Sequence, residues 1–245
     1  MKQIAGRLGW FVINFIQAVF TVLWTALWVL AALVLLAVTL NHNLPLVMAR
    51  RFWAAGLLLG ARTRLEVHGV NDIDFSQPHV FVCNHQSTID IPIVFRAIPQ
   101  NLHFIIKKEL FYIPFVGWFA WATGMIFVDR KNQIRVVASL RKIGRQIRAG
   151  RSVIAFPEGT RSRGQGIQPF KKGVFFAAIE AGVPIIPVLI EGADVAMPAD
   201  SFSVRPARVR VTLGKPIATT GLSAADRARL SELTRERIHA LRGSS

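Results

Sequence analysis

A long apolar segment near the N-terminus limits what this chain can fold into more than any other feature. Residues 8–40 contain no Lys, Arg, Asp or Glu, and the next charged residue is Arg50. As one helix this segment would be about 50 Å long, whereas the hydrocarbon core of a bilayer is about 30 Å thick. It is also longer than the apolar core of a signal peptide, and no convincing cleavage site follows it. We expect a membrane-associated helix; the alternative is a buried core helix of a soluble protein.

A second apolar helix is predicted directly after the first. The sequence NHNLP (41–45) interrupts the apolar run, and residues 46–60 resume it with Arg50 and Arg51 included. We therefore expect residues 1–62 to form a two-helix membrane anchor, and its geometry suits a re-entrant pair better than one upright span. More Lys and Arg follow the run than precede it, which favours a cytoplasmic location for the rest of the chain. A re-entrant pair would place both chain ends there.

Composition narrows the class of protein further. The chain has 52% hydrophobic residues, which excludes a disordered chain, and 30 Lys+Arg against 14 Asp+Glu give a net charge of +16. Such a charge is typical of proteins that bind nucleic acid, a membrane surface or phosphorylated substrates. The single cysteine, Cys83, excludes a disulfide scaffold and a multi-thiolate zinc site, and favours a reducing compartment.

The remainder of the chain, residues 63–245, has the pattern of one α/β domain with a mixed sheet. Short β-branched runs bounded by turn residues alternate with helical stretches. A stripe of apolar residues at spacings of three and four predicts a helix over about 132–149, and a Ser223–Asp226 capping box predicts another that ends at Gly243. The predicted strands are 64–70, 79–85, 103–108, 125–130, 152–157, 183–192 and 208–217.

The first polar segment at a strand end is NHQSTID (84–90). His85 and Asp90 would lie about 140° apart on a continuous helix, so they can meet only if His85 lies in the turn and Asp90 in the first helical turn. The carboxylate would then accept the proton of one imidazole nitrogen and leave the other free to deprotonate a substrate hydroxyl. The alternative is structural, because Ser87 and Asp90 also fit a helix capping box.

A second polar segment is FPEGTRSRGQGIQPFKKG (156–173), in which Lys171 and Lys172 add positive charge. Gly159 permits a close approach of backbone to a ligand, and Arg161 and Arg163 carry planar guanidinium groups suited to phosphate oxygens. Glu158, an acid among bases, should have a protein partner or accept a ligand hydroxyl. The alternative is an ordinary basic loop.

The third segment, GMIFVDR (124–130), brings Arg130 to the end of a predicted strand, where it either faces a ligand or pairs with Asp129. Together the three segments and a fourth resemble the glycerolipid acyltransferase family, specifically the 1-acyl-sn-glycerol-3-phosphate acyltransferases. Residues 107–117 and 169–173 also resemble the bacterial enzymes. The four blocks occur in the family's order as NHQSTID (84–90), GMIFVDR (124–130), FPEGTRS (156–162) and VPIIPV (183–188).

This resemblance implies a membrane-bound enzyme that moves a fatty acyl group from acyl-CoA or acyl carrier protein to the sn-2 hydroxyl of 1-acyl-sn-glycerol-3-phosphate, giving phosphatidic acid. It assigns His85 as the general base and Asp90 as the residue that orients it. It implies direct attack on the thioester, without a covalent acyl-enzyme, a metal ion or a cofactor. The substrate-binding residues that it implies are Arg130, Glu158, Gly159 and Arg161, with Lys107 as a further candidate.

The expected location is the cell membrane, namely a bacterial inner membrane with the catalytic domain on its cytoplasmic face. No acid lies between Lys131 and Arg151, so this basic stretch is expected either to attract anionic lipids or to form a solvated helix face. No nucleic-acid partner is expected. Two other functions stay open: acylation of another lyso acceptor, such as a lyso-ornithine lipid or a lysophospholipid, and non-catalytic binding of anionic lipid. The remaining histidines match no motif and are predicted to be structural or surface residues: His42, His68, His79, His103 and His239.

Overall fold

The fold centres on one seven-stranded sheet in a computed structural model that describes residues 2–129 and 133–243. Every predicted strand is present, and each ends one to four residues earlier than predicted. After β1 and β6 the chain turns at glycines with a positive φ, Gly69 and Gly192. The spatial order is β1-β7-β6-β2-β5-β3-β4. The strands are β1 (Thr63–His68), β2 (Val80–Cys83), β3 (Leu102–Lys107), β4 (Ile126–Val128), β5 (Ser152–Ala155), β6 (Ile185–Glu191) and β7 (Ala207–Leu213).

The sheet is mixed, as predicted, because β7 runs antiparallel to β6 while the other pairs are parallel. Strands β2 and β5 are buried along their whole length, which explains why both read as continuous apolar runs rather than alternating ones. The edge strand β1 alternates instead between half-buried and exposed residues. Parallel central strands also place the loops that follow them at one edge of the sheet.

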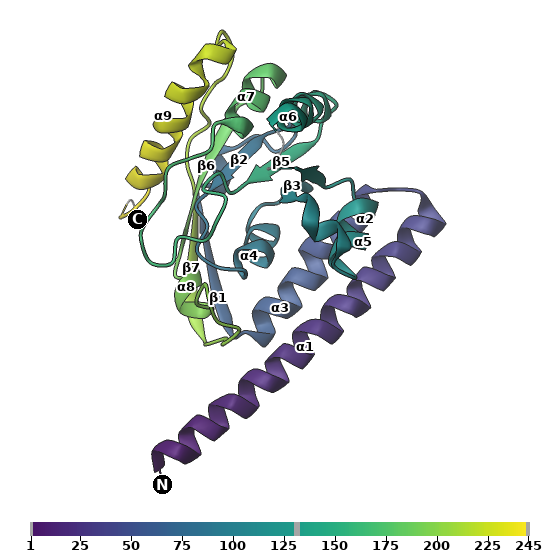
Figure 1. The fold of residues 1–245 in the computed structure, drawn as a ribbon, viewed down its shortest axis with the longest axis vertical. Helices are drawn as coiled ribbons and strands as arrows, with labels where there is room; N and C mark the ends of the chain where they lie inside the picture. Colours follow the sequence, from purple (N-terminus) through teal and green to yellow (C-terminus); the bar gives the residue numbers. More distant parts are fainter. Residues whose placement is uncertain (1, 130–132, 244–245) are drawn as a thin grey trace.

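Helices cover both faces of the sheet (Figure 1). One face carries α3 (Ala54–Gly60), α4 (Asp90–Ala97) and α5 (Val116–Ala122), and Phe81 of β2 points into this layer. The other face carries α6 (Gln133–Arg148), α7 (Gly173–Ala181) and α9 (Arg227–Ala240), where Val80 and Val82 point. The short helix α8 (Ala193–Ala196) packs beside β7. Two apolar cores, one on each side of the sheet, therefore hold the domain together.

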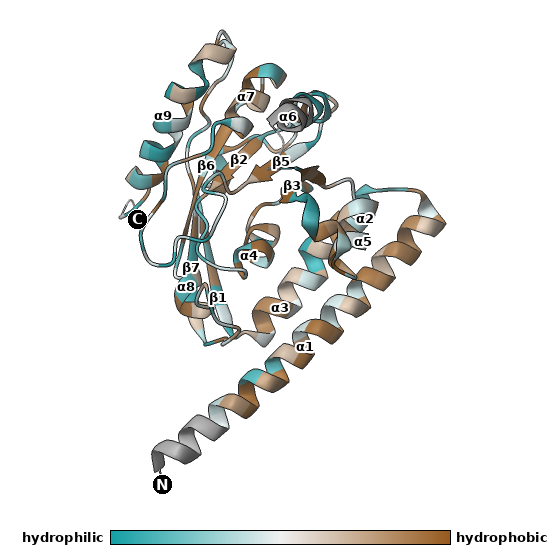
Figure 2. Ribbon diagram, viewed as in Figure 1, coloured by the Kyte–Doolittle hydropathy of each residue, from teal (hydrophilic) through white to brown (hydrophobic). Residues whose placement is uncertain are grey.

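The N-terminal apolar segment forms α1 (Lys2–Thr39), which is brown along most of its length in Figure 2. Its residues Gly9–Thr39 are long and apolar enough to cross a membrane, and only 11% of the most apolar window is buried. The alternative prediction of a buried core helix is therefore wrong. That α1 lies in a membrane stays a prediction.

The second apolar helix is present, but it belongs partly to the core of the domain. It consists of α2 (Asn43–Met48), one π-helical turn η1 (Ala49–Trp53) and α3. Leu46 and Leu58 are buried in the same cluster as the residues of α4 and β2. The domain boundary at residue 62 and the two-helix anchor stay predictions.

One face of α1 turns towards the rest of the protein and carries polar residues beside apolar ones, of which Val29 and Ala32 are the most buried. Asn14, Gln17, Thr21 and Thr25 recur at spacings of three and four, so they lie on one side of the helix. Asn14 Oδ1 accepts the Val204 N–H at 2.8 Å. Thr25 Oγ1 accepts the indole N–H of Trp53 at 3.2 Å. Asn14 and Thr25 thus hold α1 on the domain by hydrogen bonds, and the exposed face of α1 is apolar.

His103, a buried residue near the N-terminal end of β3, makes the stability of the fold depend on pH. Burial lowers the pKa of His103 from 6.5 to about 4, because the interior disfavours the charged imidazole. The unfolded chain therefore takes up this proton first as the pH falls, so the stabilising contribution is complete above pH 6.5 and is lost between about pH 6.5 and 4. Lowering the pH from 6.5 to 5 should cost roughly 2 kcal/mol of unfolding free energy.

Urea-induced unfolding of the detergent-solubilised chain at the two pH values measures this difference. The variant His103→Gln is the matched control, because it keeps a polar side chain but removes the titration. An equal loss of stability in the variant would contradict the assignment.

Candidate active site

The polar segments meet at the carboxyl ends of β2 and β5. These strands are parallel neighbours, with Val82 opposite Ala155. His85 lies two residues beyond the end of β2, and Glu158 lies three residues beyond the end of β5. The parallel register therefore brings NHQSTID and FPEGTRS together, as their positions at strand ends predict.

His85 and Asp90 are in direct contact. The Nδ1 atom of His85 lies 2.7 Å from Oδ2 of Asp90, which is fully buried in the first turn of α4. His85 itself lies in the turn before that helix, so the geometry predicted for a pair five residues apart is present. The same oxygen accepts the backbone N–H groups of Gln86 and Ser87, at 2.7 and 2.9 Å. Asp90 thus contacts the imidazole and also holds the turn, while α4 has no side-chain N-cap hydrogen bond. The role of Asp90 in orienting a catalytic base stays a prediction.

The contacts of the His85–Asp90 pair favour one tautomer and one orientation of the imidazole. A carboxylate at Oδ2 accepts the Nδ1–H, which leaves the Nε2 lone pair of His85 free to accept a proton. Burial raises the pKa of Asp90, and the hydrogen bonds from His85 and the two backbone N–H groups act against this shift. The ring of Phe156 stacks on the imidazole with the ring centres 4.4 Å apart. The His85 side chain keeps 19% of its surface exposed, so a substrate can reach it.

Glu158 connects the two polar loops. Its Oε1 accepts the backbone N–H of His85 at 2.7 Å, and its Oε2 accepts that of Gln168 at 2.9 Å. The carbonyl oxygen of His85 accepts the N–H of Ser162 at 2.8 Å. Burial raises the pKa of Glu158, and the two backbone N–H groups oppose the shift. The protein partner predicted for this acid is therefore present, and its role in binding an acceptor stays a prediction.

The predicted cationic residues differ in their placement. Arg161 is half-buried, and its Nη1 donates to Thr88 Oγ1 at 3.1 Å, so it reaches from the β5 loop to the turn that carries His85. Gly159 has a φ of 75°, a left-handed conformation that favours glycine in this turn. Lys107 is exposed at the end of β3.

Arg130 lies outside the described residues, so its predicted contact with a ligand and its alternative pairing with Asp129 both stay predictions. Asp129 accepts a hydrogen bond from Lys108 Nζ at 2.7 Å.

Two residues, Asn84 and Phe156, support the site in ways that the spacing of the polar residues does not predict. Asn84 donates from Nδ2 to the Ile190 carbonyl at 2.9 Å and accepts the Ile190 N–H at 2.7 Å, so it continues the pairing of β2 with β6 beyond Cys83. Phe156 supports the imidazole ring. Asn84 and Phe156 each begin one of the polar motifs, and this position is the only sequence feature that indicates a role in the site.

The neighbouring Ser87 and Cys83 are not free nucleophiles. The Ser87 hydroxyl donates to the Met197 carbonyl oxygen. Burial raises the pKa of the Cys83 thiol, and the charge of Asp90 raises it further, so the thiolate is disfavoured.

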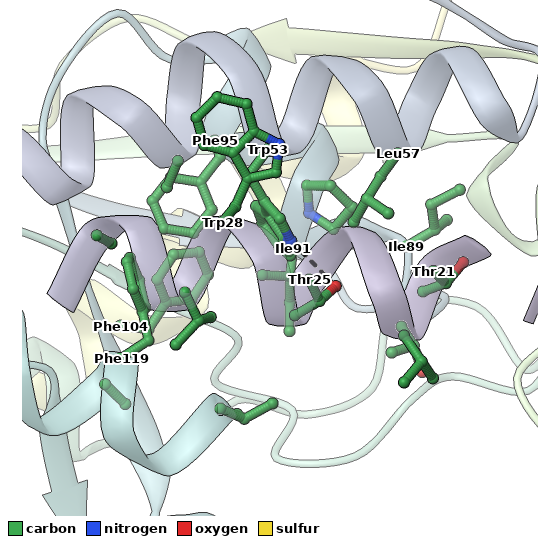
Figure 3. A pocket seen from close by; sticks show the side chains of 18 of the residues that line it. Thr21, Thr25, Trp28, Trp53, Leu57, Ile89, Ile91, Phe95, Phe104 and Phe119 are labelled. Atoms are coloured by element: carbon green, nitrogen blue, oxygen red, sulfur yellow. Dashed lines mark hydrogen bonds between the residues drawn. The ribbon is translucent and has the colours of Figure 1, made fainter. Parts of the chain in front are cut away.

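An apolar cavity of about 440 Å³ lies beside this turn (Figure 3). Thr88 and Ile89, which lie between His85 and Asp90 in the sequence, form part of its wall. It extends between α1 and the domain, and its mostly apolar lining suits an alkyl chain rather than a polar ligand. Other lining residues labelled in Figure 3 are Thr21, Thr25, Trp28, Trp53, Leu57, Ile91, Phe95, Phe104 and Phe119.

Comparison with known proteins gives one family. The family model described as Acyltransferase matches residues 64–191, more than half of the 245 residues. A 1-acyl-sn-glycerol-3-phosphate acyltransferase of Haemophilus influenzae is 42% identical over 111 residues, which are 45% of this chain and 46% of the relative. The alpha form of that enzyme from Mus musculus is 32% identical over 174 residues, 70% of this chain and 61% of the relative.

The matches with such curated relatives span about half of their length. One solved structure is similar over the whole fold: the 1-acyl-sn-glycerophosphate (LPA) acyltransferase from Thermotoga maritima. It superposes with a TM-score of 0.77 at 25% sequence identity, and the alignment covers 100% of this chain and 99% of the other.

Proposed function

This chain belongs to the acyltransferase family, and we propose that it transfers a fatty acyl group from a thioester to the sn-2 hydroxyl of 1-acyl-sn-glycerol-3-phosphate, forming phosphatidic acid. The observation that carries the proposal is the His85–Asp90 pair, because Thr88 and Ile89, which lie between the two residues, line an apolar cavity. A general base next to a site for an alkyl chain is what acylation of a lysolipid requires. The names of the relatives support the choice of acceptor.

The reaction needs one proton to move twice. Nε2 of His85 takes the proton of the sn-2 hydroxyl while its oxygen attacks the thioester carbonyl carbon. The tetrahedral intermediate then collapses, the C–S bond breaks, and the thiolate leaves with the proton that His85 carries. Asp90 stabilises the imidazolium formed in between and holds its orientation. No acyl-enzyme is required, which agrees with the buried Cys83 and with the engaged hydroxyl of Ser87.

The acceptor phosphate is proposed to bind at the β5 loop. The guanidinium of Arg161 is next to the turn that carries His85, because it donates to Thr88. A planar guanidinium binds two phosphate oxygens at once, which suits this acceptor. Glu158, Gly159 and Lys107 remain proposed binding residues at the same edge of the sheet. Arg130, which lies outside the described residues, remains a proposed binding residue because of its motif.

The donor is proposed to be acyl-CoA or acyl carrier protein, and the enzyme is proposed to work at the cytoplasmic face of a bacterial inner membrane. The lysolipid acceptor dissolves in the bilayer, whereas such donors are soluble in water, so the site must lie where the two phases meet. The exposed apolar face of α1 supports this location. In the proposed topology both chain ends are cytoplasmic.

An acceptor panel tests the proposal. The purified chain is given a labelled acyl-CoA or a labelled acyl carrier protein and one acceptor at a time: lysophosphatidate, lysophosphatidylethanolamine or a lyso-ornithine lipid. We expect the highest kcat/KM with lysophosphatidate, because Arg161 can pair with its dianionic phosphate. A higher value with another acceptor would replace the proposed substrate, and no transfer to any acceptor from either donor would favour a non-catalytic lipid-binding protein.

A further inference from the structure

A second apolar surface lies on the catalytic domain, in the helical segment between β3 and β4. It consists of a short 3-10 helix, η3 (Lys108–Tyr112), and of α5. Tyr112 is 80% exposed and Trp121 is 70% exposed. Exposed apolar clusters of this size mark contact sites in soluble and membrane proteins. The exposed side chains of this aromatic patch are Phe111, Tyr112, Ile113, Val116, Trp118 and Trp121.

The exposure follows from how α5 packs. Gly117, Ala120 and Ala122 form its buried side. A Cβ atom at Gly117 would lie 2.0 Å from the Phe111 carbonyl oxygen, so η3 packs on α5 only because this residue is glycine. Trp118 and Trp121 are three residues apart, so they share one side of α5, and they are 48% and 70% exposed. Both indole rings therefore lie on the surface of the domain.

The aromatic patch adjoins the exposed face of α1. The imidazole Nδ1 of His42, in the turn after α1, lies 2.7 Å from the Ala122 carbonyl oxygen at the end of α5 and can donate to it. Figure 1 shows α5 beside the C-terminal half of α1, and the two helices are in contact. Val34 and Val38 in that half are exposed, Val38 by 78%. His42, which matches no motif, therefore joins two apolar surfaces.

Three observations indicate what covers the aromatic patch. Its neighbour α1 is the one described helix that is long and apolar enough for a bilayer. Trp and Tyr, which combine an apolar ring with a polar atom, are enriched at the level of lipid headgroups. Lys107 is exposed just before η3, and a cation at this position favours an anionic lipid surface, whereas Lys108 is paired with Asp129.

We propose that residues 108–122 insert into the headgroup region of the bilayer beside α1, as a membrane contact that belongs to the catalytic domain itself. The inference rests on the membrane location in the proposed function. Val116 and Phe119 of α5 also line the apolar cavity. α5 therefore forms a wall between the cavity and the lipid, and membrane contacts on two different helices, α1 and α5, fix the tilt of the domain so that this wall faces the bilayer.

Spin labels test the proposal in the full chain, in a Cys83→Ser background. Single cysteines replace Trp121 on α5, Leu27 on α1 and Glu232 on α9, which lies on the far side of the sheet (Figure 1). The chain is reconstituted into vesicles of phosphatidylethanolamine and phosphatidylglycerol. Collision rates of each nitroxide with oxygen, which enters lipid, and with a nickel chelate, which stays in water, report its location.

We expect the label at 121 to behave like that at 27, with oxygen collisions dominant, and unlike that at 232. A label at 121 that matches 232 while 27 lies in lipid would overturn the inference and leave the membrane location of α1 intact. Water exposure of the labels at 27 and 121 would overturn both the proposed contact of residues 108–122 and the membrane location of α1. Protection at 121 from oxygen and nickel alike would show a protein partner or a second copy instead of lipid.

A double variant provides a second, functional readout. Trp118→Ser with Trp121→Ser should lower acyl transfer to lysophosphatidate in vesicles by about tenfold or more, since two interfacial rings are lost. Transfer to the same acceptor in detergent micelles should be unchanged, because neither residue lines the cavity. Equal activity of variant and wild type on vesicles would contradict the proposed contact.

Discussion

Replacing His85 by alanine is expected to lower kcat for acyl transfer by about 100- to 10,000-fold, the usual effect of removing a general base. The chain should stay folded, because His85 keeps its hydrogen bonds to Glu158 and Ser162 through backbone atoms that alanine also has. Initial rates of phosphatidic acid formation measure the effect, and circular dichroism checks the fold. A variant with most of its activity would show that another group accepts the proton.

Asp90→Asn is the companion variant. Asparagine has nearly the same shape, but its uncharged amide cannot stabilise the imidazolium, so the rate should again fall strongly. Asp90 also accepts two backbone N–H groups, so the unfolding free energy must be measured alongside the rate. A variant that loses stability but retains its rate would leave Asp90 with the structural role alone.

Replacing Arg161 by alanine should raise the KM for lysophosphatidate by about 10- to 100-fold, since a charge-assisted contact is worth roughly 1.5–3 kcal/mol. The KM for the thioester should change much less. Arg163→Ala is the matched control, two residues away, because Arg163 is exposed and pairs with Asp200 at 3.2 Å. Exposed pairs of this kind contribute little, so the control should resemble wild type.

The measurement is a pair of KM values for each variant, one for each substrate. A raised donor KM with an unchanged acceptor KM would reassign Arg161 to the phosphates of CoA. Equal effects of Arg161→Ala and Arg163→Ala would mean that only the general positive charge of the loop matters.

Sequence patterns predict the parts of this fold that depend on residues close together in the sequence. The β-branched runs give all seven strands, and the apolar stripe over 132–149 gives α6. The Ser223–Asp226 capping box is present as predicted, because its two partners are only three residues apart. The His85–Asp90 contact is predictable for the same reason, since one turn joins the two residues.

Contacts between distant segments are not predictable in this way. Glu158 and His85 are 73 residues apart, and only the parallel pairing of β2 with β5 brings the carboxylate to the His85 N–H. The cavity needs α1, α4 and α5 together, so no single segment indicates it. Likewise, the apolar residues of the second helix gave no sign that Leu46 and Leu58 join the core instead of facing lipid.

The central claim is that this chain acylates a lysolipid in the bilayer with His85 as the base. The most direct measurement reconstitutes wild type and His85→Ala separately into vesicles that contain lysophosphatidate, adds an isotopically labelled acyl-CoA outside, and follows labelled phosphatidic acid by mass spectrometry. We predict labelled phosphatidic acid with wild type and a rate at least about 100-fold lower with His85→Ala. Equal rates with the two proteins would contradict the account.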